Sequence, residues 1–320
     1  MNRILIWVLL VCLLATACEA EATPAPTIPP VQFFPEPIHT PLPNATAIAP
    51  PTRAPKRDAT TIPLMAPTST PKTTFQTPAF NTVAWKDLPV IPESIDPSLS
   101  KVYERGVRLG NDPHAFSIFG DCQTQPDEFF GVFESDRLVF ASLPGELQET
   151  VTYFEGSFSR QSSTSQDGTT PGALLWTQWH RGQYGCTFGE TPVECELRVH
   201  RPSFVIIQIG THFESRNTEY LRKIILQLLD EGVVPILATK ADNREKDERI
   251  NRDMASLASE YDLPLWNFWA ALSDLPGRGL YTRDDRPLQG PIYLNEEAAL
   301  RHRMTGLAAL NAVWRAVAGE

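Results

Sequence analysis

Two sharp turns in the sequence place reactive side chains directly after apolar segments. The first turn follows the apolar run 116–119, reads Gly-Asp-Cys and ends at Cys122. The second follows the apolar run 204–209, reads Gly-Thr-His and ends at His212. A thiolate is a strong nucleophile, and an imidazole can act as its base or donate a hydrogen bond to an oxyanion. Cys122 and His212 therefore point to nucleophilic chemistry at the ends of two strands.

Such turns meet when the strands before them are parallel neighbours in one sheet, because open α/β sheets place their sites at the carboxyl ends of strands. Strand-like and helix-like apolar patterns alternate along the chain. The expected strands are 115–119, 204–209, 233–238 and 265–268, the expected helices are 217–230, 245–261 and 297–317, and an amphipathic stretch covers 147–158. This alternation predicts an α/β fold of three αβα layers (flavodoxin-like), with helices covering both faces of a parallel sheet.

The two turns resemble motifs of the SGNH (GDSL-type) hydrolases. That family has Gly-Asp-Ser at one strand end, its first block, and Gly-x-Asn at another, its third block. The segments 239–243 and 263–269, and the closing stretch 307–314, look like later parts of the same domain. The resemblance covers residues 86–320 and implies a sheet of the SGNH-hydrolase type with a cleft for esters.

The resemblance also suggests site residues. Cys122 stands where the family has its nucleophilic serine, and His212 stands where it has the asparagine that binds the oxyanion. Gly168, in the loop 165–169, is the candidate for the glycine of the second block. The resemblance implies that the backbone N–H groups of Cys122 and Gly168 bind an oxyanion. His212 then donates the third hydrogen bond or acts as the base, but not both.

The Asp-x-x-His motif that closes the family's site is missing from the segment 281–294. Its nearest remnants are Asp284 and Asp285, with Leu288 or Tyr293 where a histidine is expected. Two hypotheses follow. The favoured one is a catalytically degenerate domain that binds an acylated or glycan ligand in the cleft. The other is a cysteine-dependent ester hydrolase, or an enzyme that remodels acyl groups of the cell envelope.

The N-terminus has the pattern of an export signal. Arg3 precedes the short apolar run 4–14, and small residues lead to Cys18. This pattern predicts a signal peptide over 1–17 that is too short to span a membrane. Because the cysteine resembles that of a bacterial lipobox, we expect a lipid on Cys18 and a location outside the cytoplasm, anchored to the cell membrane. The alternative is ordinary secretion with cleavage nearby.

Residues 18–85 differ in composition from the rest of the chain. They hold about half of its 29 prolines, mixed with Thr and Ala. Such a segment buries too little apolar surface to offset the entropy of ordering, so we expect a disordered tether ahead of the domain 86–320.

The net charge of the chain limits the classes of partner that it can bind. The formal net charge is -10, and no stretch is rich in Lys or Arg. Nucleic-acid phosphates require the opposite sign, so we expect no nucleic-acid partner. The lipid on Cys18, rather than the surface of the domain, should hold the protein at the membrane.

The five cysteines of the chain fall into different predicted roles. If Cys12 leaves with the signal and Cys18 takes the lipid, Cys122, Cys186 and Cys195 remain in an oxidising compartment. Cys186 and Cys195 flank a short loop, which predicts a disulfide between them. Cys122 is then a free thiol.

The remaining histidines and tryptophans have less specific interpretations. We expect His302, between two arginines, to lie on the surface, and no histidine pair shows the spacing of a metal site. The sequence thus predicts neither metal nor cofactor. Trp266 and Trp269 should belong to the core, whereas Trp176 and Trp179 are candidates for stacking on a sugar.

Overall fold

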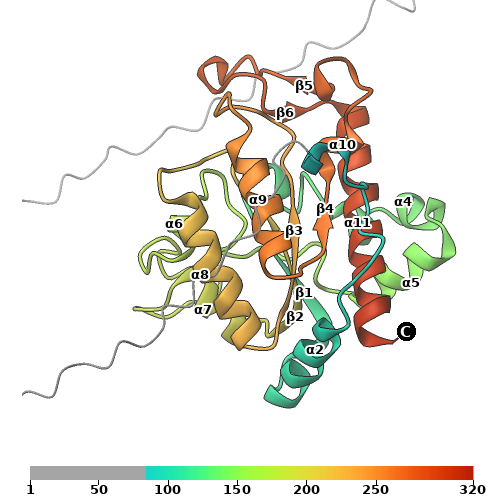
Figure 1. The fold of residues 1–320 in the computed structure, drawn as a ribbon, viewed down its shortest axis with the longest axis vertical. Coiled ribbons are helices and arrows are strands. Elements are labelled where there is room, and N and C mark those ends of the chain that lie inside the picture. The colour runs from blue at the N-terminus through green and yellow to red at the C-terminus, as the bar shows by residue number, and fades with distance from the viewer. Residues whose placement is uncertain (1–83, 320) are drawn as a thin grey trace, which may run out of the picture. The chain divides into compact units, whose positions relative to one another are not determined.

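The structure, a computed structural model, describes residues 84 to 319. The predicted signal peptide, the lipidated Cys18 and almost all of the predicted tether lie outside the described residues. A parallel sheet with the strand order β1-β2-β3-β4 forms the centre of the described part (Figure 1). Its strands are β1 (Asp112–Gly120), β2 (Pro202–Gln208), β3 (Val234–Ala238) and β4 (Leu265–Trp266).

The central strands are buried on both faces. In β2, the side chains of Phe204, Val205, Ile206 and Ile207 are all fully buried. Continuous apolar runs of this kind are typical of parallel strands that helices cover from both sides.

Helices form a layer on each side of the sheet. Figure 1 shows α8 (Asn217–Asp230) and α9 (Arg249–Glu260) on one side, and α11 (Glu296–Ala318) with α5 (Gly145–Tyr153) on the other. Helix α2 (Ser98–Leu109), the first α-helix of the described residues, packs against α11. The predicted α/β fold with helices on both faces is therefore confirmed.

Short elements complete the described part. The short α-helices are α3 (Val132–Ser135), α4 (Arg137–Ser142), α6 (Pro171–Leu174), α7 (Pro192–Val199) and α10 (Phe268–Ala271). The 3-10 helices are η1 (Ala84–Asp87), η2 (Cys122–Thr124), η3 (Pro276–Gly279) and η4 (Pro287–Gln289). β5 (Leu280–Tyr281) and β6 (Tyr293–Leu294) form a small antiparallel pair ahead of α11.

The predicted elements match best where the apolar pattern is longest. The predicted helix 217–230 coincides with α8, whose Leu221, Ile224 and Leu228 are buried at helical spacing. The predicted helix 245–261 begins too early, because Glu245 is buried in a turn and α9 starts only at Arg249.

The predicted strand 265–268 is too long. β4 ends at Trp266, and the side chain of Asn267 then accepts a hydrogen bond from the backbone N–H of Ala270, which caps α10. Capping by Asn is a common way to begin a helix. Phe268 therefore lies in a helix rather than in the strand.

The segment before α2 closes the β4 edge of the sheet. The backbone N–H of Asn267 donates to Val90 O at 3.0 Å, and its side-chain Nδ2 donates to Trp85 O and Leu88 O, both at 2.9 Å. Trp85 is buried, with its ring 5.8 Å from that of Trp269. The ordered domain thus includes residues just ahead of position 86.

The disulfide between Cys186 and Cys195 is confirmed, with their Cα atoms 5.2 Å apart, and Cys122 is a free, buried cysteine as predicted. Trp266 and Trp269 are buried, which confirms their place in the core.

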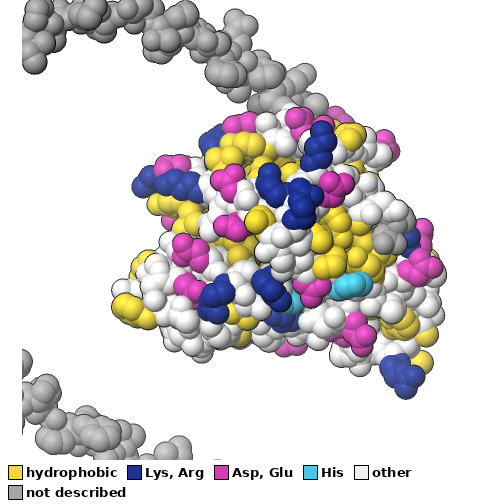
Figure 2. Space-filling model, turned by 90° about the horizontal axis from the view of Figure 1, so that it is seen from below, with side chains coloured by type: hydrophobic (Ala, Val, Ile, Leu, Met, Phe, Trp, Pro, Cys, Tyr) yellow, Lys and Arg dark blue, Asp and Glu magenta, His cyan; other side chains and the backbone are white. Residues whose placement is uncertain are grey.

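The surface of the described part carries charges of both signs. On the face shown in Figure 2, basic and acidic side chains lie interspersed between small apolar areas. Within residues 84 to 319, no helix combines the length and the apolar character needed to cross a membrane.

Candidate functional site

The turn after β1 is fixed by the carboxylate of Asp121. Its Oδ1 accepts a hydrogen bond from Gln123 N at 3.4 Å, which caps η2. Its Oδ2 accepts hydrogen bonds from Gly210 N at 3.1 Å and Thr211 N at 3.0 Å. One buried side chain therefore connects the turn after β1 to the turn after β2. Burial, and then the charge of Asp242, raises the pKa of Asp121.

The second turn requires glycine at its first position. Gly210 has a φ of +143°, and a Cβ there would lie 2.4 Å from Cγ2 of Ile250. Only glycine adopts this backbone conformation and fits this space. The turn after β2 therefore packs closely against Ile250 of α9.

A buried polar chain continues from these turns. Thr211 Oγ1 donates to Asp242 Oδ2 at 2.7 Å. Lys240 Nζ donates to Asp242 Oδ1 at 2.7 Å and to Glu245 Oε2 at 2.6 Å. All of these side chains are at least nine-tenths buried, so the lysine compensates carboxylates that would otherwise be unpaired in the interior.

Cys122 lies directly beyond Asp121, with 9% of the residue exposed. Its Sγ is 4.0 Å from Asp121 Oδ1. Burial raises the pKa of the Cys122 thiol, and the carboxylates of Asp121, Asp167 and Asp242 raise it further. A helix N-terminus can lower the pKa of a thiol, but η2 is a single three-residue turn and the charges near the sulfur are negative, so burial and charge prevail at Cys122.

The loop that contains Gly168 runs beside the end of β1. Gly120 N donates to Thr164 O at 2.9 Å, and Gly120 pairs with Ser165 as an isolated parallel bridge. The side chain of Ser165 lies 2.9 Å from Thr124 Oγ1. Gly168 itself has a φ of +82°, a conformation that favours glycine. The structure thus places the proposed second-block loop at the same sheet edge as Cys122.

His212 points toward that loop. Its Nε2 lies 3.7 Å from Asp167 Oδ1, and this nitrogen is buried with no hydrogen-bond partner among the described residues. A nitrogen of His212, an oxygen of Asp167 and Sγ of Cys122 all lie within 4.8 Å of one another. The structure therefore brings the two predicted residues together and adds a carboxylate that the sequence analysis did not single out.

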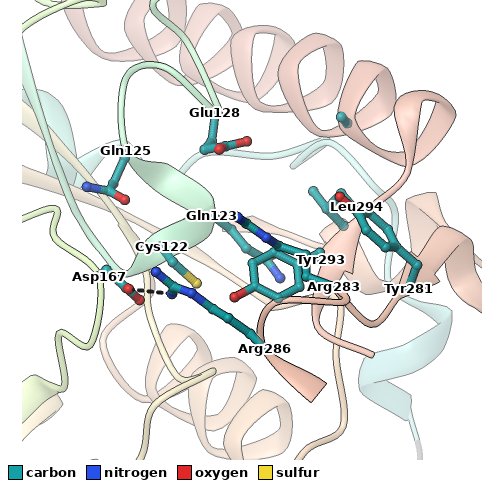
Figure 3. Close-up of a pocket in the computed structure, with 11 residues that line it drawn as sticks. Cys122, Gln123, Gln125, Glu128, Asp167, Tyr281, Arg283, Arg286, Tyr293 and Leu294 are labelled. Carbon is teal, nitrogen blue, oxygen red and sulfur yellow. Dashed lines mark hydrogen bonds and ion pairs between the residues drawn. The ribbon is translucent and has the colours of Figure 1, made fainter. Parts of the chain in front are cut away.

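A pocket of about 130 Å³ opens at Cys122, as Figure 3 shows. It is large enough for a small group rather than for a drug-sized ligand. Its lining residues are Cys122, Gln123, Gln125, Glu128, Asp167, Tyr281, Arg283, Arg286, Tyr293, Leu294 and Ala299.

The closing segment puts an arginine against this pocket. Arg286 Nη1 binds Asp167 Oδ2 at 2.7 Å, the interaction drawn in Figure 3. The carboxylate, and then Tyr293, raises the pKa of Arg286. Tyr293 also lines the pocket, and its hydroxyl donates a hydrogen bond to Gln289. Of the two positions at which a histidine was expected, only that of Tyr293 reaches the pocket, because Leu288 is 97% exposed.

The two acidic remnants do not reach the site. Asp285 forms an ion pair with Arg283 at 2.9 Å, with 59% of the Asp285 side chain exposed, and Asp284 is exposed. Neither is among the residues that line the pocket at Cys122.

The prediction that His302 lies on the surface is wrong. The residue is fully buried, its Nε2 is 2.5 Å from Gln208 Oε1, and its ring stacks on Phe129 with centroids 4.1 Å apart. Burial, and then the charge of Arg303, lowers the pKa of His302 to about 3. The flanking arginines suggested exposure, but on a helix adjacent residues point in different directions, so they say little about their neighbour.

Asp167 also lines a second pocket, of about 180 Å³. Its lining includes Trp179, His180, Arg181 and Tyr184. A Cβ on Gly168 would be 3.9 Å from the ring of Trp179, so this tryptophan is close to the site. Trp176 is 54% exposed and is not part of this lining. Of the two candidate stacking residues, only Trp179 therefore lies beside the site.

Neither protein-family models nor curated protein sequences match the chain. Among solved structures it is similar to a GDSL-like lipase from Bacteroides thetaiotaomicron, with 13% identity and a TM-score of 0.41, covering 69% of this chain and 98% of that one. It is also similar to a Bacteroides fragilis protein provisionally named an acylhydrolase, with 13% identity and a TM-score of 0.41, covering 70% of this chain and 100% of that one. This likeness concerns the fold, so the chemistry of the site has to be argued from the residues of this chain.

Proposed function

We propose that this domain is a ligand-binding module on a hydrolase-like fold that no longer hydrolyses esters by the serine-type mechanism. The observation that carries the proposal is the ion pair between Arg286 and Asp167 beside Cys122. The segment that should bring a histidine to the site brings an arginine instead. Because a guanidinium stays protonated in proteins, Arg286 cannot accept a proton from a nucleophile.

The other histidine near the sulfur is a poor substitute. A general base has to lie within hydrogen-bond reach of the proton it takes, about 2.6–3.2 Å between heavy atoms. No hydrogen bond joins Cys122 and His212 in the described part of the chain, and the nearest acid to His212 Nε2 is Asp167. Loss of the base alone costs serine hydrolases several orders of magnitude in rate.

The pocket favours a small ligand group that carries oxygen atoms. Arg283 and Arg286 can donate to a carbonyl or carboxylate, and Tyr281 and Tyr293 add aromatic surface. The acyl group of an acylated glycan has this chemistry and fits a pocket of about 130 Å³. The ligand we propose is therefore an acylated or glycan component of the cell envelope.

The test is binding of the protein to an array of glycans with and without O-acetyl groups. We expect binding that depends on the acyl group and falls at least tenfold in Arg286→Gln, because the guanidinium makes charge-assisted contacts. The matched control is Arg222→Gln, which also breaks an arginine–carboxylate pair. The side chain of Arg222 is 40% exposed and that of Arg286 is 39% exposed, but Arg222 does not line the pocket. Equal binding by wild type and Arg286→Gln would contradict the proposal.

A cysteine-dependent hydrolase is the second candidate, because a thiol, an imidazole and a carboxylate lie within 4.8 Å of one another. In that reaction Sγ of Cys122 would attack an ester carbonyl, the alcohol would leave with the thiol proton, and water would then release the acid. A burst of p-nitrophenol from p-nitrophenyl acetate, with an acetylated Cys122 found by mass spectrometry, would support this candidate and refute the binding proposal. We expect no release beyond that of Cys122→Ala.

We also propose that a lipid on Cys18 holds this module at the outside of the cell membrane. The short apolar run that ends in small residues before Cys18 supports this location. Metabolic labelling with a clickable fatty acid should mark the wild-type chain and not Cys18→Ala. Labelling of both proteins, or of neither, would refute the anchor.

A further inference from the structure

Three turns that are distant in sequence bring three metal-ligand types to one point. Cys122 follows β1, Asp167 lies in the loop beside β1, and His212 follows β2. One donor atom from each side chain lies within 4.8 Å of the other two. No pair of histidines close in the chain indicated a metal site, and these three residues, which are distant in sequence, meet where β1 and β2 pair in parallel.

One of these atoms is buried and unsatisfied. His212 Nε2 has no hydrogen-bond partner in the described part of the chain and faces Asp167 Oδ1 at 3.7 Å. An unpaired buried polar atom destabilises the fold, because it has lost its hydrogen bonds to water. A ligand placed between the nitrogen and the carboxylate would remove this destabilisation.

The carboxylate is already oriented for such a ligand. Arg286 Nη1 holds Asp167 Oδ2 at 2.7 Å, while Asp167 Oδ1 is the oxygen that faces His212. Metal-binding carboxylates commonly have their second oxygen held by a hydrogen bond of this kind, which fixes the group and tunes the metal. Arg286 would therefore be a positioning residue for Asp167.

The donor set and spacing fit zinc. Sulfur, nitrogen and oxygen bind Zn²⁺ at about 2.0–2.3 Å, so donors of a tetrahedral site lie roughly 3.5 Å apart. His212 Nε2 lies 3.7 Å from Asp167 Oδ1, close to this spacing. The distances from Cys122 Sγ to the other two donor atoms are at most 4.8 Å, so small side-chain rotations would bring all three to the spacing of a zinc site. Thiolate with imidazole favours zinc over magnesium or calcium, which prefer oxygen alone.

We propose that Cys122, Asp167 and His212 bind one Zn²⁺ ion, with a fourth coordination position facing the pocket. Two of the three ligands line that pocket, so a water molecule or a ligand oxygen could complete the coordination. Binding replaces the thiol proton by the metal and releases one proton to solvent. The proposal does not rest on the proposed function, because metal binding is measured without any organic ligand.

The experiment is a titration of the full-length, chelator-treated protein with Co²⁺, followed by competition with Zn²⁺. We expect one Co²⁺ per chain and a near-ultraviolet charge-transfer band from thiolate to cobalt, which Zn²⁺ abolishes. The band should disappear in Cys122→Ser, and affinity should fall at least tenfold in Asp167→Asn and in His212→Gln. The double variant Cys12→Ser/Cys18→Ser should keep the band.

Two controls keep the result interpretable. His114→Gln replaces an exposed histidine elsewhere on the domain and should not change the affinity. Circular dichroism shows whether each variant is folded, and Asp167→Asn replaces Cys122→Ser as the decisive variant if the latter is not. A folded wild type without a thiolate–cobalt band, or a band that is lost only in Cys12→Ser/Cys18→Ser, would overturn the proposal.

Discussion

Acidification should destabilise this domain through one buried histidine. His302 Nε2 lies 2.5 Å from Gln208 Oε1, and the Gln208 amide nitrogen donates to Thr239 O at 3.1 Å. Because Gln208 Oε1 can only accept a hydrogen bond, the neutral imidazole of His302 carries its proton on Nε2. The other nitrogen, Nδ1, is buried without a partner among the described residues, and the rings of Phe129 and Phe268 pack against the imidazole. A second proton would therefore put a charge into apolar surroundings.

The pKa sets the size of the effect. Burial, and then the charge of Arg303, lowers the pKa of His302 to about 3 in the folded protein, against about 6.5 in an unfolded chain. Between these values the unfolded state binds more protons, so stability falls as the pH falls. The contribution of His302 is fully present above about pH 6.5 and is lost progressively down to about pH 3. Within this range each pH unit changes the free energy of unfolding by about 1.4 kcal/mol, so the protein loses about 3 kcal/mol of stability between pH 7.5 and pH 4.

His302→Gln isolates this contribution. The amide can still donate to Gln208, but it does not titrate and fills less of the space between the rings. We expect the variant to be less stable than wild type by about 2 kcal/mol at pH 7.5 and at least as stable at pH 4. Urea unfolding followed by tryptophan fluorescence at several pH values measures both proteins. Other titrating groups are shared, so they cancel in the difference.

The control is His114→Gln, which removes an exposed histidine. It tests whether the stability curves of wild type and variant cross between pH 7.5 and pH 4 when any histidine is lost. The reasoning would be refuted if the His302→Gln curve stayed below the wild-type curve by a constant amount from pH 7.5 to pH 4. In that case His302 would be accessible to protons in the folded state.

Three further predictions concern stability at neutral pH, each measured by urea unfolding. Cys186→Ser with Cys195→Ser should cost up to about 3 kcal/mol, as expected for a disulfide that spans a sequence separation of 9, and no loss would mean that the loop is held by other contacts. Lys240→Met should cost about 3–5 kcal/mol because it leaves two buried carboxylates without their cation, and a neutral result would contradict the ion pairs. Gly210→Ala should cost at least about 1 kcal/mol, since its Cβ would meet Ile250 at 2.4 Å, and full stability would show that the turn can relax.

The sequence predicted the layers of the fold because their signals are local. The apolar spacing in 217–230 identified α8 to the residue, and the runs in β1, β2 and β3 were long enough to identify strands. The ends of the short elements were less certain. The Asn267 cap turned the chain into α10 two residues before the predicted end of the strand, a choice that apolar pattern alone does not reveal.

Half of the candidate site was visible in the sequence. Cys122 and His212 follow recognisable turns, so their meeting could be predicted from the parallel arrangement of the strands. Asp167 and Arg286 could not be predicted, because their partnership joins positions separated by 119 residues along the chain. The only signal for Asp167 was its place next to Gly168. The burial of His302 depends on the rings of Phe129 and Trp266, which come from other elements.

The contact between the first described residues and the β4 edge has a mechanical consequence. Hydrogen bonds at Asn267, the packing of Trp85 and an ion pair between Lys86 and Glu248 attach the start of this segment to the domain. A force that pulls on residue 84 would load these bonds one after another, whereas the ladder between β1 and β2 would be loaded later. We expect a small first step in single-molecule extension, which Asn267→Ala should abolish. Because β4 and β1 lie at opposite edges of the sheet, the domain could yield under tension while the turn that carries Cys122 stays in place.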